Sequence, residues 1–354
     1  MSAVRPRILF VVERFHTNLW EATRALNAAE IDVAVWGSGS GKTEDHSVIA
    51  PRLFPPDADP GAFRAAWGAL KPDLVILRNV AQHRRTVARL ARASGTPMWF
   101  YDLNPYHWRE PLKRRLTRRF QGLPLRRVTP ALGLDATVPP HRDARYIPWP
   151  VMAAPDAAPC EADTCNGREV TVLCVAKLHN PRKNHGMVID ALRAQGRAGK
   201  VRLLLAGTTG DPVQHAAQIA ALQEVASAEP WLELHANVPF KQMPELYRQA
   251  DICILPSVRE PLGFAPVESM AYGCVPVIST DAGSAGYVRH GENGLHVDVT
   301  RPGAVDEVLA PLLEDAALRH RLGAAALATA QGDLGAERFV TRMRALLQES
   351  GVTA

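Results

Sequence analysis

Short runs of consecutive apolar residues alternate with helical patterns along most of this chain. In the first half the apolar runs are RILFVV, DVAVW, PDLVILR and PMWFYD, and helical segments such as WEATRALNAAE and HRRTVARLARAS separate them. Strands that are apolar along their whole length, rather than at every second residue, indicate a parallel sheet with both faces covered. The intervening helices supply the right-handed crossovers that parallel strands need. We therefore predict a doubly wound α/β domain.

The second half of the chain repeats this alternation without repeating the sequence. Its apolar runs include EVTVLCVAK, VRLLLAG, LELHAN, DICILPS and VPVIST. Between the halves lies WPVMAAPDAAPCEADTCNGR, which is rich in Pro, Ala and acidic residues, and we interpret it as a linker. We predict an α/β fold with two Rossmann-like doubly wound domains facing a central cleft, where ligands of such sheets bind. The predicted parts are domains at 1–150 and 169–332, a linker at 151–168 and a closing helix at 333–354.

The composition argues against a membrane-spanning or metal-binding protein. The first apolar run, ILFVV, is too short for a signal peptide, and no apolar run is long enough to span a bilayer, so we expect a cytoplasmic location. Cys174, Cys253 and Cys274 lie in apolar runs, which predicts that they are small core residues. Cys160 and Cys165 flank an acidic linker without a matching histidine pair. We therefore expect no metal and no cofactor.

The stretch WGSGSGKTED, Trp36 to Asp45, has the ending of a nucleotide-binding P-loop but not its spacing. A P-loop needs a glycine, four residues and then Gly-Lys-Ser/Thr, because that spacing wraps backbone N–H groups around the phosphates. Gly41, Lys42 and Thr43 fit, but Trp36 stands at the position of the first glycine. The prolines that follow also oppose the helix that a P-loop opens. We predict a surface loop and no ATPase activity.

The positive charge of the chain is concentrated in its first half. Residues 1–150 hold 23 Lys and Arg against 13 Asp and Glu, whereas the remainder holds 18 against 23. The surplus peaks in REPLKRRLTRRFQGLPLRR, where Leu112, Leu116 and Phe120 recur every four positions. This spacing predicts an amphipathic helix from Arg109 to Arg119 with a cationic face.

Two interpretations of this basic helix stay open. The cationic face beside an apolar stripe fits peripheral contact, through 109–119, with the inner face of a membrane, and it also fits an anionic glycan or a lipid diphosphate. Alternatively, the helix packs its three apolar residues inward and leaves its charges in solvent. We expect no nucleic-acid partner, because no base-reading motif accompanies the charge.

Two glutamates in the stretch REPLGFAPVESMAYG predict a ligand site. Pro261 and Pro266 exclude one continuous helix from Glu260 to Glu268, and Pro266 suits the first turn of a short helix. The loop between the glutamates then points backbone N–H groups toward a bound anion, and Gly263 permits close approach. Such a site suits a diphosphate with a sugar on one side and a ribose on the other. The alternative is that each glutamate only caps a helix.

A basic turn in CVAKLHNPRKNHGMVIDAL supports the same interpretation. A buried strand ends at Ala176 and a helix begins near Asn184, which places Lys177, Arg182 and Lys183 at the carboxyl end of a strand. Cations at that position would neutralise a pyrophosphate. For an isolated basic turn the alternative is simple solvent exposure. Together with the glutamate pair, the cations favour a diphosphate site.

From about Val170 to Val297 the sequence resembles the donor-binding domain of GT-B glycosyltransferases, specifically the retaining family 4. EPLGFAPVE matches the glutamate, seven residues, glutamate motif of that family, and it stands between LPS and AYGCVPVIST as in the family. ANVPFKQMPELYRQADICILPS and GENGLHV match flanking segments. The resemblance implies a donor-binding second half, an acceptor-binding first half, and transfer of a sugar from a nucleotide-sugar with retained configuration and without a metal.

The resemblance also implies roles for individual residues. Glu260 would contact the donor sugar and Glu268 the ribose hydroxyls, while Lys183 matches the pyrophosphate lysine of the family. The other residues that it implies in donor binding, through the loop backbone or beside it, are Gly263, Phe264, Ala265, Arg182 and Val238.

Several positions depart from the family pattern. Lys177 stands where the family usually has arginine, which keeps the charge but loses the bidentate fork. Tyr101 stands where an active-site histidine commonly precedes the aspartate, here Asp102, and His107 is near in sequence. Gly286 stands where a glutamate is often found. We take Tyr101, Asp102 and His107 as candidate residues on the acceptor side.

These observations predict a retaining glycosyltransferase that acts in glycan or cell-envelope glycoconjugate synthesis. Its acceptor would be a glycan, a lipid-linked molecule or a small molecule with a hydroxyl group. Lys177, Lys183 and the amides of PLGFA would stabilise the charge growing on the diphosphate leaving group. Two alternatives stay open, namely a nucleotide-sugar epimerase of the same fold, which needs no second substrate, and a non-catalytic nucleotide-sugar-binding subunit.

Overall fold

The computed structural model divides the chain into two compact units, which are described separately below. The described residues are 5–41, 43–78, 83–135, 137–151, 156–159 and 168–352. The first unit comprises Met1–Ala131, Thr137–Pro150 and Ala336–Ala354, and the second comprises Leu132–Ala136 and Val151–Gly335. Lys42 and the linker cysteines Cys160 and Cys165 lie outside the described residues.

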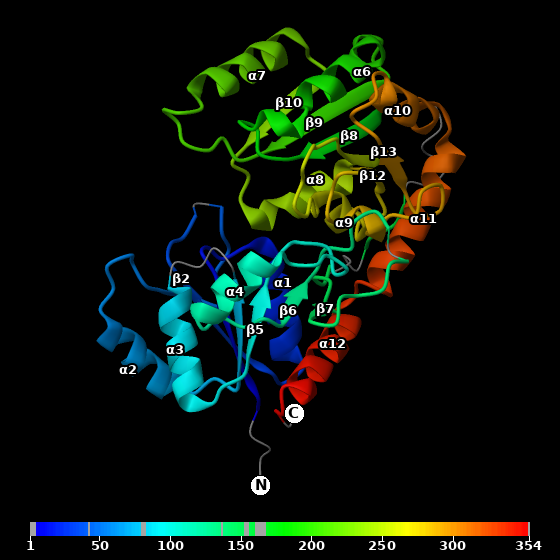
Figure 1. Cartoon of the computed structure of the whole chain (residues 1–354). Helices are drawn as coiled ribbons and strands as arrows, with labels where there is room; N and C mark the ends of the chain where they lie inside the picture. Colours follow the sequence, from blue (N-terminus) through cyan, green and yellow to red (C-terminus); the bar gives the residue numbers. More distant parts are fainter. Residues whose placement is uncertain are drawn as a thin grey trace. The chain divides into compact units, whose positions relative to one another are not determined.

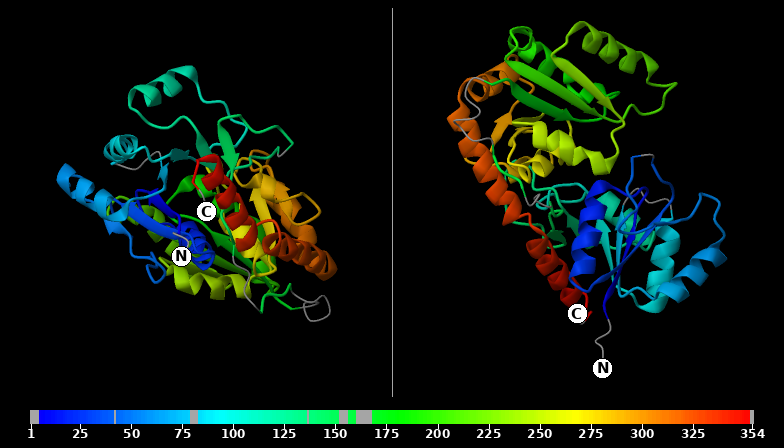
Figure 2. Two further views of the ribbon diagram at one scale, coloured as in Figure 1. Left: turned by 90° about the horizontal axis from the view of Figure 1, so that it is seen from below. Right: turned by 180° about the vertical axis from the view of Figure 1, so that it is seen from behind.

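The first unit is built on a seven-stranded parallel sheet in the order β3-β2-β1-β4-β5-β6-β7. Figures 1 and 2 show α2 and α3 on one face of this sheet and α1 and α12 on the other. The strands are β1 (Arg7–Val11), β2 (Asp32–Gly37), β3 (Arg52–Leu53), β4 (Leu74–Arg78), β5 (Met98–Tyr101), β6 (Arg127–Thr129) and β7 (Ala144–Tyr146). The helices are α1 (Thr17–Ala28), α2 (Pro60–Leu70), α3 (Arg84–Ser94), α4 (Leu112–Phe120) and α12 (Ala336–Glu349).

The second unit is built on a six-stranded parallel sheet in the order β10-β9-β8-β11-β12-β13. The strands are β8 (Val170–Val175), β9 (Val201–Gly207), β10 (Leu232–Ala236), β11 (Ile252–Leu255), β12 (Val275–Ser279) and β13 (Leu295–Val297). The α-helices are α6 (His185–Arg197), α7 (Ala216–Ala228), α8 (Met243–Gln249), α9 (Ala265–Met270), α10 (Ala304–Glu314) and α11 (Ala316–Gln331). Single 3-10 turns form η1 (Pro181–Lys183), η2 (Phe240–Gln242) and η3 (Ala285–Tyr287).

The strand β8 shows why its sequence is apolar at consecutive positions. Val172 and Cys174 belong to the core that contains α6 and α10, whereas Leu173 belongs to the core that contains α8. All three side chains are fully buried, so both faces of the sheet are covered. The prediction of two doubly wound parallel sheets is therefore confirmed, and so is the burial of Cys174, Cys253 and Cys274. The predicted central cleft stays a prediction.

The last helix, α12, returns to the first unit. Its Phe339 ring lies 6.2 Å from that of Trp149, and the indole Nε1 of Trp99 donates a 2.9 Å hydrogen bond to the Ser350 hydroxyl just beyond the helix. α12 also packs against α1. The helix α12 therefore belongs to the same unit as β1 and α1.

The loop after β2 agrees with the rejection of a P-loop. The strand β2 ends at Gly37, and the described residues between 38 and 51 form no helix. The N–H groups of Ser38 and Gly39 donate to the Glu13 carbonyl, at 3.1 and 3.2 Å. The segment is therefore a loop fixed to the strand end beside it, as predicted.

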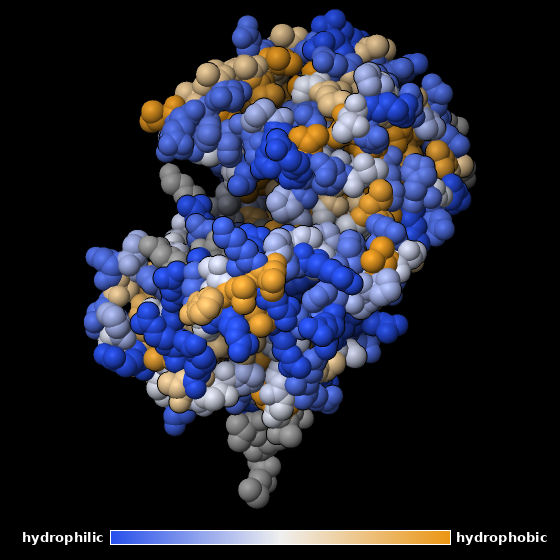
Figure 3. Space-filling model, viewed as in Figure 1, coloured by the Kyte–Doolittle hydropathy of each residue, from blue (hydrophilic) through white to orange (hydrophobic). Residues whose placement is uncertain are grey.

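The basic helix α4 differs from its prediction in its start and in its packing. It begins at Leu112, not at Arg109, because Pro111 stands at its N-cap. The apolar residues Leu112, Leu116 and Phe120 are 71%, 45% and 88% exposed, so the interpretation that packs them inward is wrong. Figure 3 shows apolar surface over this helix, bordered by hydrophilic residues. Within the described ranges, no helix has the length and apolar character needed to cross a bilayer.

Candidate active site

The candidate site of the second unit lies at the point where its strand order reverses. β8 pairs with β9 on one side and with β11 on the other. The chain leaves β8 through residues 176–184 and leaves β11 through residues 256–264. Doubly wound sheets bind ligands at the carboxyl ends of strands at such a point. The two segments singled out in the sequence are therefore neighbouring loops at this edge.

Lys183 and Glu260 meet between these two loops. The Lys183 ammonium forms an ion pair with the Glu260 carboxylate, across 77 positions of sequence. Their side chains are only 13% and 12% exposed. Because both charges are partly withdrawn from water, their attraction is screened less than that of a surface pair. The pair fixes one cation and one carboxylate at the strand ends.

Further hydrogen bonds join the two loops. The Asn184 side-chain amide donates to the Pro256 carbonyl at 2.7 Å, and the Val258 N–H donates to the Arg182 carbonyl at 2.9 Å. The Arg182 guanidinium itself donates to the Arg259 carbonyl at 3.1 Å. Arg182 is thus engaged in holding the loops, and its side chain remains exposed beside the ion pair.

Position 263 requires a glycine, both for its backbone conformation and because neighbouring side chains pack closely against it. Its φ of +72° is left-handed, and a Cβ atom there would lie 2.6 Å from Leu255 Cδ2 and 2.7 Å from Glu260 Cγ. The Ser284 hydroxyl donates to its carbonyl at 2.7 Å. Any side chain at this position would therefore displace Glu260.

Glu268 lies in the first turn of α9, as predicted, but with a partner that the sequence did not indicate. The Tyr247 hydroxyl, from α8, donates a 2.7 Å hydrogen bond to its carboxylate. Burial raises the pKa of Glu268, and the hydrogen bond from Tyr247 lowers it in part. Burial and the nearby Glu268 also raise the pKa of Tyr247 well above its usual range, so the phenol stays a donor.

The remaining predicted donor-site residues surround this pair of loops. Phe264 is buried with its ring edge-on to Tyr287 at 5.8 Å, and Ala265 begins α9. Val238 is partly buried against the core cluster of α8. Lys177 is exposed in the loop after β8, where its carbonyl accepts from the Asn180 N–H at 3.1 Å.

Close packing explains why position 286 is a glycine. A Cβ atom on Gly286 would lie 2.5 Å from the Gly133 carbonyl oxygen and 2.9 Å from Leu132 Cβ. The N–H groups of Leu132 and Gly133 both donate to the Gly283 carbonyl at 2.9 Å, which holds that segment in place. A glutamate at position 286 would not fit this packing.

The candidate acceptor-side residues of the first unit are engaged in internal contacts. The Tyr101 hydroxyl accepts from the Trp149 indole at 3.0 Å, and burial raises the pKa of Tyr101 to about 12. Asp102 is buried and pairs with Arg127 at 3.0 Å, while burial raises its pKa and Arg127 lowers it in part. His107 lies against the Tyr106 ring, and its buried Nδ1 has no partner among the described residues. Tyr101 is thus a neutral phenol and a poor proton acceptor.

The described residues contain no group of three or more His, Cys, Asp or Glu side chains placed to hold a metal ion. The charged groups of the second-unit site are instead the cations of Lys177, Arg182 and Lys183 and the side-chain carboxyls of Glu260 and Glu268. The arrangement can bind an anion and accept hydrogen bonds from hydroxyl groups. Sequence reasoning missed Tyr247, Ser284 and Arg127. Tyr247 lies in a segment that matches the family, but nothing in that segment indicates that its hydroxyl contacts Glu268.

Comparison with known proteins finds similarity in the second unit. Residues 163–329 match the family model of glycosyl transferases group 1. A D-inositol 3-phosphate glycosyltransferase of Xylanimonas cellulosilytica is 32% identical over 133 residues, which are 37% of this chain and 32% of that protein. The protein of the same description from Corynebacterium glutamicum is 40% identical over 86 residues, 24% of this chain and 20% of that protein. The matches thus span a third or less of these relatives' own length.

Solved structures are similar over nearly the whole chain. HepE of Anabaena, solved in complex with UDP and glucose, has a TM-score of 0.70 at 16% identity and covers 98% of this chain and 100% of that one. Sucrose-phosphate synthase of Thermosynechococcus elongatus has a TM-score of 0.66 at 18% identity and covers 98% and 99%. At such low identity these likenesses concern the fold, and they confirm the predicted α/β class with two Rossmann-like domains.

Proposed function

We propose that this protein transfers a sugar from a nucleotide-sugar donor to a hydroxyl group of an acceptor. The proposal starts from the match of residues 163–329 to glycosyl transferases group 1. The single observation that carries the proposal is the Lys183–Glu260 pair between the loops after β8 and β11. A cation there suits a diphosphate, and the neighbouring carboxylate suits the hydroxyls of a sugar. Glu268, with Tyr247 behind it, would accept hydrogen bonds from the ribose.

In the proposed reaction the bond between the sugar C1 and the diphosphate breaks, and a bond from C1 to the acceptor oxygen forms. Lys183, the exposed Lys177 and the backbone of Gly263, Phe264 and Ala265 would stabilise the charge that grows on the leaving diphosphate. We propose retention of configuration, by attack on the face that the diphosphate leaves. The acceptor proton would pass to a leaving phosphate oxygen, since the neutral Tyr101 is a poor base.

The two rival functions predict different requirements. An epimerase would convert the donor without a second substrate, and a non-catalytic subunit would bind the donor without converting it. Incubation with donor alone and with donor plus a glycan, lipid-linked or small-molecule hydroxyl acceptor separates all three functions. We propose transfer only in the presence of an acceptor, in glycan or glycoconjugate synthesis.

We expect a matching nucleotide-sugar or nucleoside diphosphate to raise the melting temperature of the full chain. A ligand at about 100 times its Kd stabilises the folded state by about 2.7 kcal/mol, which a thermal shift screen over sugars and nucleobases detects. Lys183→Ala should reduce this shift, because it removes the proposed diphosphate cation. The matched control is Lys200→Ala, an exposed lysine at the opposite, amino end of β9.

The same screen tests the proposed independence from metal ions and cofactors. Excess chelator should change neither the shift nor transfer by the wild type. Strict dependence on Mg²⁺ or Mn²⁺ would mean that a metal, not Lys183, neutralises the diphosphate. A screen in which no nucleotide-sugar or nucleoside diphosphate shifts the melting temperature would contradict the donor site as a whole.

We further propose peripheral contact of α4 with the cytoplasmic face of an anionic membrane. The exposed residues Leu112, Leu116 and Phe120 follow one stripe of the helix, and Lys113 and Arg119 flank it on the helical wheel. Arg115 and Arg118, by contrast, form ion pairs with Asp143 and Glu110 inside the unit. An apolar stripe between cations suits a surface of anionic lipid headgroups.

Leu116→Ser with Phe120→Ser should lower binding to anionic vesicles by about tenfold or more, because two exposed apolar side chains are lost. Lys113→Gln with Arg119→Gln should lower it further at low salt, since each cation contributes about 1 kcal/mol near such a surface. Vesicle sedimentation measures both effects. Val213→Ser is the control, since Val213 is also highly exposed but lies in the second unit. Equal pelleting of all proteins would remove the membrane proposal.

A further inference from the structure

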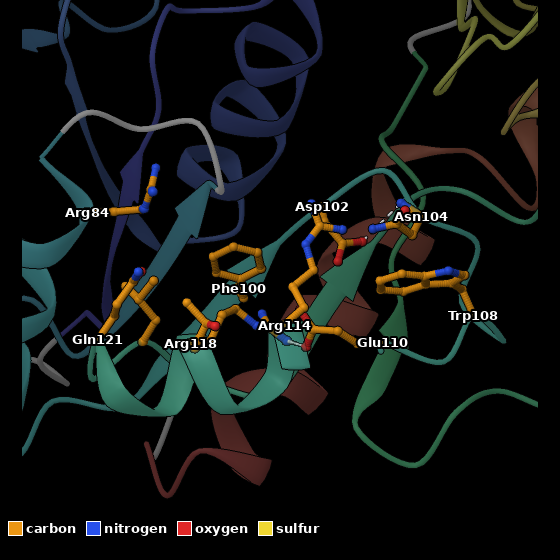
Figure 4. A pocket seen from close by; sticks show the side chains of 11 residues that line it. Arg84, Phe100, Asp102, Asn104, Trp108, Glu110, Arg114, Arg118 and Gln121 are labelled. Atoms are coloured by element: carbon orange, nitrogen blue, oxygen red, sulfur yellow. Dashed lines mark hydrogen bonds and ion pairs between the residues drawn. The ribbon is translucent and has the colours of Figure 1, made fainter. Parts of the chain in front are cut away.

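A cavity of about 230 Å³ lies in the first unit, between α4 and the carboxyl end of β5. Figure 4 shows Arg114 and Arg118 reaching it from α4, and Phe100 and Asp102 from the end of the strand. The ring of Trp108 lies at one end and Arg84, from the start of α3, at the other. The proposed donor site lies in the other unit and uses none of these arginines, and of the three candidate acceptor-side residues only Asp102 is in the described lining. The cavity therefore needs an explanation of its own.

Arg118 is the central residue of this cavity, and it is only 7% exposed. Its Nη2 donates to the Glu110 carboxylate and to the Leu125 carbonyl, and its guanidinium lies 4.4 Å from the centroid of the Phe100 ring. Its Nε and Nη1 are buried and have no acceptor among the described residues. A buried donor without an acceptor costs about 1–3 kcal/mol, so a cavity lined by one favours a ligand that brings an acceptor.

The charges around the cavity do not balance. Arg84, Arg114 and Arg118 line it together with the carboxylates of Asp102 and Glu110. Arg127 stands behind Asp102 and pairs with it at 3.0 Å. Arg118 is paired with Glu110 and Arg127 with Asp102, so the two carboxylates of the described lining leave the charge of Arg114 unbalanced.

We propose that this cavity binds a phosphoryl group, carried either by a small soluble molecule or by a lipid headgroup. A phosphate monoester has a charge of about −1.5 to −2 at neutral pH and three acceptor oxygens, which suit the guanidinium of Arg114 and the two unused donors of Arg118. A carboxylate brings two acceptor oxygens instead of three, so it would satisfy the donors of Arg114 and Arg118 less completely. The volume exceeds the need of a single ion, and the rings of Phe100 and Trp108 provide apolar walls for an organic part of the ligand.

The inference does not depend on the proposed transferase activity, and calorimetric titration of the full chain with inorganic phosphate tests it directly. Phosphate would also fit the proposed diphosphate site of the second unit, so the titrations are made with Lys183→Ala protein. In that background, Arg114→Gln should weaken phosphate binding by about tenfold or more, because it removes a charge-assisted hydrogen bond. Arg114 is exposed, so this change should leave the fold intact.

The matched control is Arg89→Gln, which removes the same charge from an exposed position of α3 outside the cavity. It should bind phosphate as the Lys183→Ala parent does. Arg118→Lys keeps the charge but loses the fork, and it should weaken binding as Arg114→Gln does. Acetate should bind more weakly than phosphate to the parent protein.

The source of the phosphoryl group is found with phosphatidylcholine vesicles prepared with and without phosphatidic acid. If vesicles with phosphatidic acid compete with free phosphate for the cavity, and Arg114→Gln abolishes this competition, the ligand is a lipid headgroup. Phosphate binding without such competition assigns it to a soluble ligand. The proposal would be overturned if Arg114→Gln and Arg89→Gln bound phosphate equally well. It would also be overturned if the parent did not bind phosphate, or if it bound acetate more tightly than phosphate.

Discussion

Replacing Glu260 by Gln is expected to lower turnover by about tenfold or more, which is about 1.4 kcal/mol of transition-state stabilisation. The proposed role of its carboxylate is to contact the donor sugar while Lys183 holds it in place. Gln keeps the size of the side chain and an oxygen that accepts from Lys183, so the melting curve should change little. The measurement is kcat and KM with a donor found in the thermal shift screen.

Glu224→Gln is the matched control for Glu260→Gln, because Glu224 is an exposed glutamate of α7 in the same unit. The complementary change, Lys183→Ala, should weaken nucleoside diphosphate binding by about 1–3 kcal/mol, because it removes a charge-assisted contact. Since the two side chains touch, their effects should not add in the double variant. Wild-type turnover in Glu260→Gln would exclude the proposed site.

The sequence indicates the strands of this fold well because burial on both faces leaves a local signal. Val172, Leu173 and Cys174 are apolar in succession since each of them faces one of two cores. The strand-end loops follow from the same argument, because parallel strands place their carboxyl ends at one edge of the sheet. Lys183 and Glu260 could therefore be assigned to one site although they stand 77 residues apart.

The partners of the site residues could not be predicted, since they depend on packing that has no local pattern. Tyr247 reaches Glu268 from a helix 21 residues earlier, and nothing in PELYRQA distinguishes its hydroxyl from that of an ordinary core tyrosine. The periodicity of α4 predicts two faces but not which of them packs. Here the buried side chain is Arg118, held by Glu110 and the Phe100 ring, and the apolar stripe is exposed.

Glu268→Gln is expected to weaken nucleoside diphosphate binding by about tenfold or more while leaving the protein at least as stable as the wild type at neutral pH. The affinity falls because the proposed hydrogen bonds from two ribose hydroxyls lose their charged acceptor. The stability does not fall, because burial raises the pKa of Glu268 in the folded state. As the pH rises above about 4.3, the unfolded chain loses this proton before the folded protein does, so the free energy of unfolding falls with pH. The loss is complete once the pH exceeds the raised pKa of Glu268 in the folded state, and it persists above that pH.

Two measurements separate this role of Glu268 from a structural one. A nucleoside diphosphate that lacks both ribose hydroxyls should bind the wild type about as weakly as the normal ligand binds Glu268→Gln, and the variant should not distinguish the two ligands. Tyr247→Phe removes the only hydrogen bond to the Glu268 carboxylate found among the described residues, so it should lower the melting temperature and raise the pKa of Glu268 further. If Glu268→Gln discriminates between the two ligands as the wild type does, Glu268 does not bind the ribose and serves only to hold α8 against α9.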